Sequence, residues 1–509
     1  MIPELAILEA ESTGGSSSAR RKNVLWVGGT PPDSLVGLLL GHQLTVVPIT
    51  ASVNSIRAHA APACGLVLQL PPDVDPEAWA RDMINVALDH GLLVIFTSPD
   101  FPQSKHVEEE RERRRCIDST TAMIQVNRVH AVTDATKIVR QLDDHKPGAG
   151  ANEDLQIAGD IPSDASVVTL LRRAFADLHG VTLKLLQGGK SGASVWIAHP
   201  SARDLDRRLA PFLVKSNSVA KMQAEESNFS LFAQDAVSFR LRPPVHSARC
   251  VTGAQSALLV FDFIDRAISF RSAIRSYPAG QLIGSLFDHT LAGCLSGARD
   301  VTTSLVTPFV KINALRWSDD LRAAATIARQ QDPDTSDVDT LKQTVEALPA
   351  VKHRVATSHS DLHTGNLLVA AGSSDVLLID FGAIVNNMPV VTDAAGLEVS
   401  MTFAPQDVRE ELGRTCPTND KTWLEKVYEY PMDPHTVGIR DDGERWLSEA
   451  VRAIRGAARQ HDPDPRAYAV AIAAYLIRYA SYADNEKVED RALAYRIAVR
   501  VIASVMGAK

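Results

Sequence analysis

The chain has 509 residues, of which 22% are charged and 45% hydrophobic, and its formal net charge is −8. This length exceeds one ordinary core and predicts two or three domains, while the acidic balance argues against a protein built mainly to bind nucleic acid. No apolar run approaches the roughly 20 residues that a membrane span needs. The first basic residues follow the short apolar start, which is the wrong order for a secretory signal. The five cysteines form no CxxC pair, which favours reduced thiols in a cytoplasm. Together these features lead us to expect a cytoplasmic protein with no membrane partner.

The N-terminal part is predicted to be an α/β domain. Residues 1–22 are expected to be a disordered lead-in because their second half is rich in Ser, Gly and charge. In residues 23–142, short apolar runs alternate with segments of helical period, a pattern typical of buried parallel strands. The runs lie at 24–27, 44–47, 65–68, 92–96 and 122–126. They predict a doubly wound sheet with ligands at the carboxyl ends of its strands.

A linker is predicted to separate this domain from a larger one. Residues 143–165 carry acids, Gly and Pro with little apolar periodicity. The rest of the chain begins with strand-like runs and Gly turns and ends in an Ala-rich region whose apolar residues are spaced by three and four. That spacing predicts helices in the C-terminal part.

The segment 358–366, SHSDLHTGN, sets two histidines, a carboxylate and a carboxamide between apolar segments. Two apolar runs follow it, and the hexapeptide 370–375, AAGSSD, separates them in a pattern that predicts a β-hairpin. Because a hairpin brings its two ends together, Asn366 and Asp380 are expected side by side. Asp361 would then lie on the loop just before the hairpin.

These residue types suit phosphoryl transfer. An amide oxygen and a carboxylate are hard ligands for Mg²⁺, which also binds phosphate oxygens. The separate carboxylate of Asp361 can accept a proton from an attacking hydroxyl, so the segment offers both a metal site and a base. The alternative is a polar turn capped by Asn366 and Asp361.

The sequence HSDLHTGN followed by IDFG resembles the HxDxxxxN and DFG motifs of the protein-kinase-like superfamily. It is most similar to the aminoglycoside phosphotransferase and choline kinase branch, over about residues 180–480. The resemblance implies an α+β bilobal domain with an N-lobe at 166–264 and a C-lobe at 265–509 that contains a helical substrate subdomain. It also implies an ATP- and Mg²⁺-dependent kinase that moves the γ-phosphate to a hydroxyl of a small molecule.

The same resemblance assigns residues to roles. Asp361 would be the base, Asn366 and Asp380 the metal ligands, and Lys215, at the end of an apolar strand, the clamp on the α- and β-phosphates. The expected partner of Lys215 is Glu225, with Glu226 left open because the helix phase is uncertain by one residue. A Gly-containing turn would cover the phosphates through the backbone of Gly188, Gly189 and Gly192, and the strand at 257–264 would hold the adenine.

Three further residues belong to the predicted catalytic loop. The resemblance implies that His359 is structural and bonds the backbone near Asp380. For His363, a place near the phosphates and a filling role in the loop both stay open. Asp393 is expected to be a helix N-cap or a brace of the catalytic loop. No APE sequence closes an activation segment, and the region also resembles phosphotransferase-like domains, such as ternary-complex-associated ones, in bacterial multi-domain signalling proteins.

The N-terminal domain resembles a response-regulator receiver that has lost its chemistry. Gly28 and Gly29 stand where an acidic pair normally follows the first strand, and no aspartate ends the third strand. Without those carboxylates we expect no metal site and no phosphorelay. The domain would then serve as an interaction or regulatory module with a protein partner. An unrelated Rossmann-like domain is the alternative.

Other functions remain open at this stage: a nucleotide-binding pseudokinase or scaffold, a protein kinase and an adenylyltransferase. The sequence does not name the acceptor. Acidic residues of the C-terminal region either meet a cationic substrate or face solvent; they are Glu425, Glu429, Asp441, Asp442 and Glu444.

Overall fold

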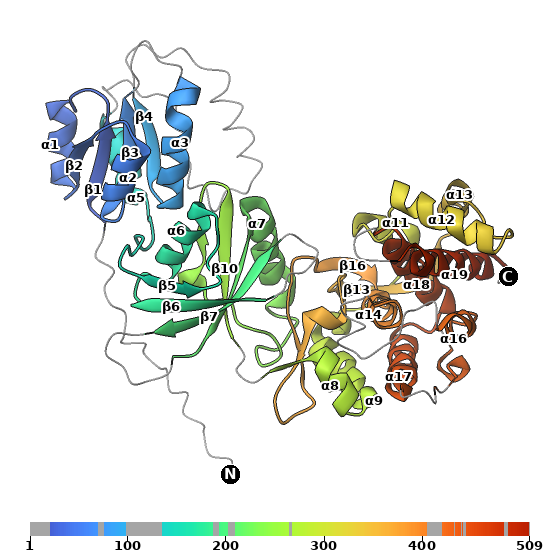
Figure 1. Cartoon of the computed structure of the whole chain (residues 1–509). Helices are drawn as coiled ribbons and strands as arrows, with labels where there is room; N and C mark the ends of the chain where they lie inside the picture. The colour runs from blue at the N-terminus through green and yellow to red at the C-terminus, as the bar shows by residue number, and fades with distance from the viewer. Residues whose placement is uncertain are drawn as a thin grey trace. The chain divides into compact units, whose positions relative to one another are not determined.

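The computed structural model divides the chain into two compact units (Figure 1). The N-terminal unit comprises Met1–Met222 with Val245–Phe263, and the C-terminal unit comprises Gln223–Pro244 with Ile264–Lys509. The residues described are 21–69, 76–97, 135–186, 193–201, 209–263, 267–404, 420–431, 433–438, 440, 444–482 and 487–507.

The N-terminal unit begins with a parallel sheet in the order β2-β1-β3-β4 (Figure 1). Its strands are β1 (Asn23–Val27), β2 (Thr45–Ile49), β3 (Ala63–Gln69) and β4 (Leu93–Thr97). Its helices are α1 (Asp33–Gly41), α2 (Val53–His59), α3 (Pro76–Asp89) and α5 (Ala135–Asp144). The first four predicted strands and the parallel α/β class are confirmed, and the fifth predicted strand lies outside the described residues. Likeness to a receiver stays a prediction.

Both faces of this sheet are covered because successive strand residues point to opposite sides. Leu25 of β1 belongs to the core that includes Ile56 of α2 and Met83 of α3. Its neighbour Trp26 belongs to the opposite core, with residues of α1 and α5 such as Leu39. The near-continuous apolar runs in the sequence thus reflect burial on two faces.

Packing against Gln69 explains the Gly28-Gly29 pair. Gly28 has a φ of 90°, and a Cβ on it would collide with the Gln69 carbonyl oxygen. A Cβ on Gly29 would meet the Gln69 side chain. Because only glycine tolerates both the positive φ and the close approach, the end of β1 has no room for larger side chains.

The second sheet of this unit has six strands in the order β5-β6-β7-β8-β10-β9. The strands are β5 (Gln156–Gly159), β6 (Gly180–Leu186), β7 (Ser194–Ser201), β8 (Phe212–Ser218), β9 (Val251–Thr252) and β10 (Ser256–Asp262). The sheet carries α6 (Ala165–Ala174), and α7 (Val219–Asn228) follows β8. Strand β5 lies inside the predicted linker, where it pairs parallel with β6. Leu155 and Ile157 anchor this segment in the core.

Arg173 of α6 joins the two sheets of the N-terminal unit. Its side chain is buried and donates to the Asp89 carbonyl at 2.7 Å and to the Thr252 carbonyl at 3.0 Å. The Asp89 carboxylate accepts from the Ala254 backbone N–H at 2.9 Å. Burial raises the pKa of Asp89 and lowers that of Arg173 to about 9. These long-range bonds fix the parallel sheet to the β9–β10 turn.

The C-terminal unit is mainly helical (Figure 1). It has two three-stranded sheets, β11-β14-β15 and β12-β13-β16. Its strands are β11 (Ile268–Ser269), β12 (Arg299–Thr303), β13 (Val351–Ser358), β14 (Leu367–Val369), β15 (Val376–Leu378) and β16 (Val385–Pro389). Its helices are α8 (Phe270–Ser276), α9 (Ala279–Ser285), α10 (Ala292–Ser296), α11 (Val306–Lys311), α12 (Asp319–Gln331), α13 (Val338–Glu346), α14 (Thr392–Thr402), α16 (Lys421–Val427), α17 (Arg445–His461), α18 (Pro465–Ala480) and α19 (Val488–Gly507). None of the helices described meets the length and apolarity that crossing a membrane requires.

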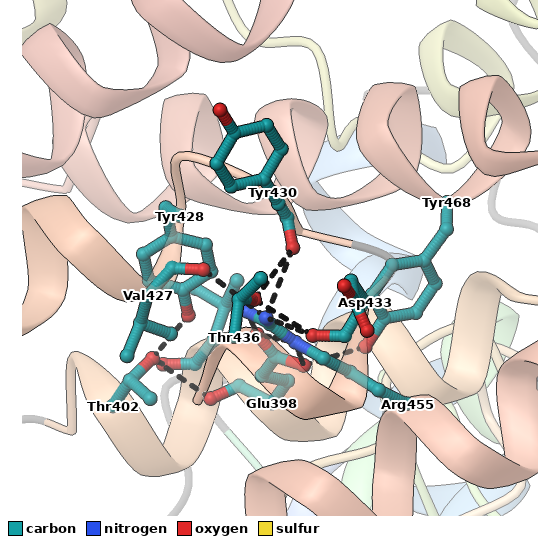
Figure 2. Close-up of polar contacts among 10 residues, drawn as sticks. Glu398, Thr402, Val427, Tyr428, Tyr430, Asp433, Thr436, Arg455 and Tyr468 are labelled. Atoms are coloured by element: carbon teal, nitrogen blue, oxygen red, sulfur yellow. Dashed lines mark hydrogen bonds and ion pairs between the residues drawn. The ribbon is translucent and has the colours of Figure 1, made fainter. Parts of the chain in front are cut away.

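A fully buried ion pair joins α14 to α17 in this unit (Figure 2). The Arg455 Nη2 lies 2.7 Å from Oε1 of Glu398, and both side chains are completely shielded from solvent. Tyr468 of α18 donates its hydroxyl to Oε2 of Glu398 at 2.7 Å. Burial alone would lower the pKa of Arg455, but the Glu398 carboxylate outweighs it and raises that pKa. One carboxylate therefore binds residues of two other helices.

The other amino group of the Arg455 guanidinium donates to backbone carbonyls. Arg455 Nη1 donates to the carbonyl of Val427, the last residue of α16, at 3.1 Å and to that of Tyr430 at 3.2 Å (Figure 2). A buried charge without such partners would cost several kcal/mol. The network thus holds α14, α16, α17 and α18 together.

We predict that Arg455→Met destabilises the C-terminal unit by about 3–5 kcal/mol, because it leaves the Glu398 carboxylate buried and unpaired. Urea unfolding measures the loss. Arg459→Met is the matched control, since Arg459 is on the same helix and exposed. Equal midpoints for the two variants would contradict the structural role of the pair.

Candidate active site

The predicted hairpin is confirmed. Strands β14 and β15 pair antiparallel, with Leu367 opposite Leu378. One residue beyond the ladder, the Ile379 N–H donates to the Asn366 carbonyl at 3.0 Å. Asn366 and Asp380 consequently sit at the same end of the hairpin, as the spacing predicted.

The Asn366 side chain is oriented by the loop before it. Its Nδ2 donates to the Asp361 backbone carbonyl at 2.9 Å. With the amino group used in this way, Oδ1 is the atom of the amide that can meet a cation. Ser360 and Asp380 both have a φ of 62°, a left-handed conformation that costs an L-residue roughly 1–2 kcal/mol. Local strain of this kind is typical of functional loops held by their surroundings.

Asp393 holds the start of this loop. Its carboxylate accepts from the Ser358 hydroxyl, the His359 N–H and the Ser360 N–H, each at 2.9 Å. Asp393 is buried in the first turn of α14, whose N-cap residue is Val391. Of the two expected roles, its contacts are those of a loop brace.

His359 is completely buried behind the loop. Its Nε2 lies 3.1 Å from the Ile379 carbonyl, one residue before Asp380. The ring also lies against Phe381, with centroids 6.1 Å apart. These contacts tie the loop to the second strand of the hairpin and give His359 a structural place.

His363 caps the short 3-10 helix Thr364–Asn366. Its Nδ1 accepts from the Gly365 N–H at 3.1 Å, which leaves the ring proton on Nε2. Burial lowers the pKa of His363 and outweighs the neighbouring Asp361 carboxylate, which raises it. The ring is therefore a neutral N–H donor at pH 7, a state that suits either role left open for it.

Helix α18 contributes two contacts to the loop that the sequence did not reveal. Arg478 Nη2 lies 2.9 Å from Oδ1 of Asp361. Tyr475, three residues earlier on the same helix face, donates its hydroxyl to the Ser360 carbonyl at 3.0 Å. The Asp361 carboxylate counteracts the burial of Arg478 and raises its pKa. The only sequence signal was an apolar helix with one arginine near its end.

A further arginine approaches the loop from α8. Arg271 Nε donates to the Thr364 hydroxyl at 3.2 Å. A Cβ on Gly365 would lie 3.0 Å from Nη2 of Arg271, so the guanidinium passes close over the loop backbone. No pattern in the sequence associates Arg271 with this segment.

The expected nucleotide residues are distributed over both units. Lys215 is buried in β8 of the N-terminal unit, opposite Leu259 of β10. Glu225, on α7, is 3% exposed, whereas Glu226 is exposed, and the choice between them as the partner of Lys215 stays a prediction. Within the C-terminal unit, a Cβ on Gly382 would lie 3.5 Å from Oε2 of Glu225. The predicted phosphate-covering residues Gly188, Gly189 and Gly192 lie outside the described residues.

The oxygen atoms of Asn366 and Asp380 suit a hard cation that is also coordinated by a bound nucleotide. In the part of the chain that is described, no three His, Cys, Asp or Glu side chains converge as a metal cluster. Asn366 and Asp380 instead offer one amide oxygen and one carboxylate at one hairpin end. Mg²⁺ is commonly bound by one or two carboxylates and by substrate phosphates, so these residues fit it.

No protein-family model matches the chain, and no curated protein matches it either. Solved structures with some likeness include an aminoglycoside 3′-phosphotransferase of type VIII, at 16% identity and a TM-score of 0.30, which covers 56% of this chain and 97% of its own. Another is an aminoglycoside phosphotransferase from Streptomyces rimosus with ADP and streptomycin, at 16% identity and a TM-score of 0.32, covering 58% and 99%. A third is the streptomycin–ATP complex of APH(2″)-IIa, at 12% identity and a TM-score of 0.30, covering 56% and 99%. These structures are phosphotransferases, but likeness of this order assigns neither activity nor substrate to the chain.

We predict that Asp393→Ala destabilises the C-terminal unit by about 2–4 kcal/mol, because three buried donors lose their acceptor. Urea unfolding measures this loss, and Asp375→Ala, in the exposed turn of the hairpin, is the control. Asp393→Asn, which keeps one acceptor oxygen, should fall between the two. An Asp393→Ala variant as stable as the control would contradict the brace.

Proposed function

We propose that the chain is an ATP- and Mg²⁺-dependent phosphotransferase that moves the γ-phosphate to a hydroxyl of a small molecule. The observation that supports this most is the hairpin, which brings Asn366 and Asp380 to one end and ties Asn366 to the Asp361 loop. A metal site and a proton acceptor on one braced loop are the parts that phosphoryl transfer needs.

Asp361 is the base in this proposal. Its carboxylate would accept the proton of the acceptor hydroxyl as the hydroxyl oxygen bonds to the γ-phosphorus. The bond from that phosphorus to the β–γ bridging oxygen breaks, and ADP leaves with the bonding electron pair. The brace at Asp393 keeps the loop in place, and the side chain of Asp361 is 36% exposed, so an acceptor can reach it.

Asn366 and Asp380 would hold the magnesium ion through Oδ1 and a carboxylate oxygen. Bound there, the ion would neutralise charge on the phosphates of the nucleotide. The orientation of the Asn366 amide supports this role, because its Nδ2 is already engaged by the loop backbone.

The remaining nucleotide contacts follow from the family resemblance and the burial of the residues. Lys215 would pair with the α- and β-phosphates, Glu225 would orient Lys215, and His363 would offer a neutral N–H donor. Gly188, Gly189 and Gly192 would cover the phosphates with backbone N–H groups. A protein partner for the parallel-sheet domain also stays a prediction.

Labelled ATP tests the reaction. We expect the label of [γ-³²P]ATP to move to an acceptor in a metabolite pool and the label of [α-³²P]ATP to stay in the nucleotide. Asp361→Ala should lower transfer by roughly 10²–10⁴-fold, the usual contribution of a general base. Asp375→Ala is the matched control.

The outcomes separate the alternative functions. Transfer of the α-label would indicate an adenylyltransferase, and label on protein alone would indicate a protein kinase. Nucleotide binding with no transfer of either label would indicate a pseudokinase or scaffold. Any of these three results would contradict the proposal.

The metal assignment predicts a second effect. Asp380→Asn should weaken ATP binding in the presence of Mg²⁺ by roughly tenfold or more, because an amide replaces a charged ligand, and should change binding in EDTA little. Isothermal titration of ATP in both media measures this. Equal ATP affinity of the variant and the wild type with Mg²⁺ would contradict the assignment.

A further inference from the structure

The charge around the Asp361 loop constrains the acceptor. Arg478 lies against the Asp361 carboxylate at 2.9 Å, and its Nε lies 3.4 Å from the hydroxyl of Tyr482. The Arg316 guanidinium lies over the ring of the same tyrosine, 5.4 Å from its centroid. A row of contacts thus leads from Asp361 through Arg478 and Tyr482 to a second cation.

Arg316 has no ionic partner within the described part of the chain. It belongs to the segment between α11 and α12, is only partly buried, and makes no ion pair with a described carboxylate. The face of an aromatic ring holds a guanidinium in position without neutralising its charge. Arg316 therefore presents a fixed positive charge beside the residues that contact Asp361.

Two of the acidic residues that the sequence offered for a cationic acceptor, Glu425 and Glu444, are engaged in ion pairs. Glu425 pairs with Arg496 at 2.7 Å and with Arg500 at 3.4 Å. Glu444 lies 3.2 Å from Arg440. These carboxylates already have cationic partners, so binding a polycation through them would first have to break ion pairs.

We propose, on the basis of the proposed phosphotransfer, that the acceptor is an anionic hydroxy compound whose carboxylate or phosphate group is bound by Arg316, next to the ion pair of Arg478 and Asp361. Guanidinium groups bind both anions through paired N–H donors. The acceptor's anionic group would occupy the Tyr482 side of the site. Its hydroxyl would then be directed to Asp361, which accepts the proton as the oxygen bonds to the γ-phosphorus and ADP departs.

Binding of matched small molecules tests this inference on the full-length chain with Mg²⁺ and a non-hydrolysable ATP analogue. Ligand-observed NMR titration would compare glycerate and glycerol 3-phosphate with uncharged glycerol, and with the cations choline and streptomycin. We expect at least one of the two anions to bind roughly tenfold or more tightly than glycerol, as a charge-assisted contact implies. Which anion binds tighter distinguishes a carboxylate from a phosphate subsite.

Variants of Arg316 test whether anion binding depends on this residue. Arg316→Gln should weaken anion binding roughly fivefold or more, whereas Arg316→Lys should retain most of it because the charge remains. Arg329→Gln, which removes an exposed arginine from α12, should behave like the wild type. Glycerol binding should be the same in all four proteins.

Several results would overturn the inference: glycerol binding as tightly as the anions, preferential binding of choline or streptomycin, no measurable anion binding, or equal effects of Arg316→Gln and Arg329→Gln. Phosphate transfer is measured separately with ATP. Anion binding without any γ-phosphate transfer would count against the proposed function, whereas transfer to choline or streptomycin in preference to the anions would overturn this inference alone.

Discussion

The carboxylate of Asp393 is the contact on which the geometry of the candidate site depends. It accepts hydrogen bonds from three consecutive residues, Ser358 to Ser360, and so holds the loop that ends in the Asp361 carboxylate. Ser360, the last of the three, adopts a left-handed conformation. An L-residue keeps such a conformation when its surroundings determine it, and the buried carboxylate provides that constraint.

The position of Asp393 depends in turn on the buried network around Glu398. Both residues are on α14, and the Glu398 carboxylate fixes that helix to Arg455 and Tyr468 of α17 and α18 (Figure 2). Helix α18 also contacts the loop directly, because Tyr475 bonds to the Ser360 carbonyl and Arg478 pairs with Asp361. Polar contacts within one unit thus connect the core to the candidate site. Helix α18 makes the last of these contacts and also places Arg478 beside the Asp361 carboxylate.

The sequence predicted those features that arise from neighbours in the chain. The strands of the parallel sheet and the hairpin from Asn366 to Asp380 follow from short apolar runs and turn residues. Strand β5 was not predicted because acids and glycine surround its few core residues in the sequence. That Leu155 and Ile157 belong to the hydrophobic core is evident only from their packing in the structure. For Asp393 the sequence predicted either a helix N-cap or a brace of the catalytic loop, and only its contacts in the structure distinguish these two roles.

Long-range pairing of charges could not be predicted in the same way. Arg478 is more than a hundred residues from Asp361 in the chain, and nothing in the local pattern links them. Likewise, Glu425 and Glu444 have the appearance of free acids until the structure shows their arginine partners. Which acidic residues are paired is therefore a property of the fold that the composition of the C-terminal region does not reveal.

The most direct measurement of the central claim is ³¹P NMR of the full-length protein incubated with ATP, Mg²⁺ and a mixture of hydroxy acids and sugar phosphates. The account predicts that the ATP resonances give way to those of ADP and of a new phosphate ester in equal amount. Release of AMP with pyrophosphate, or ATP that stays intact while bound, would contradict it.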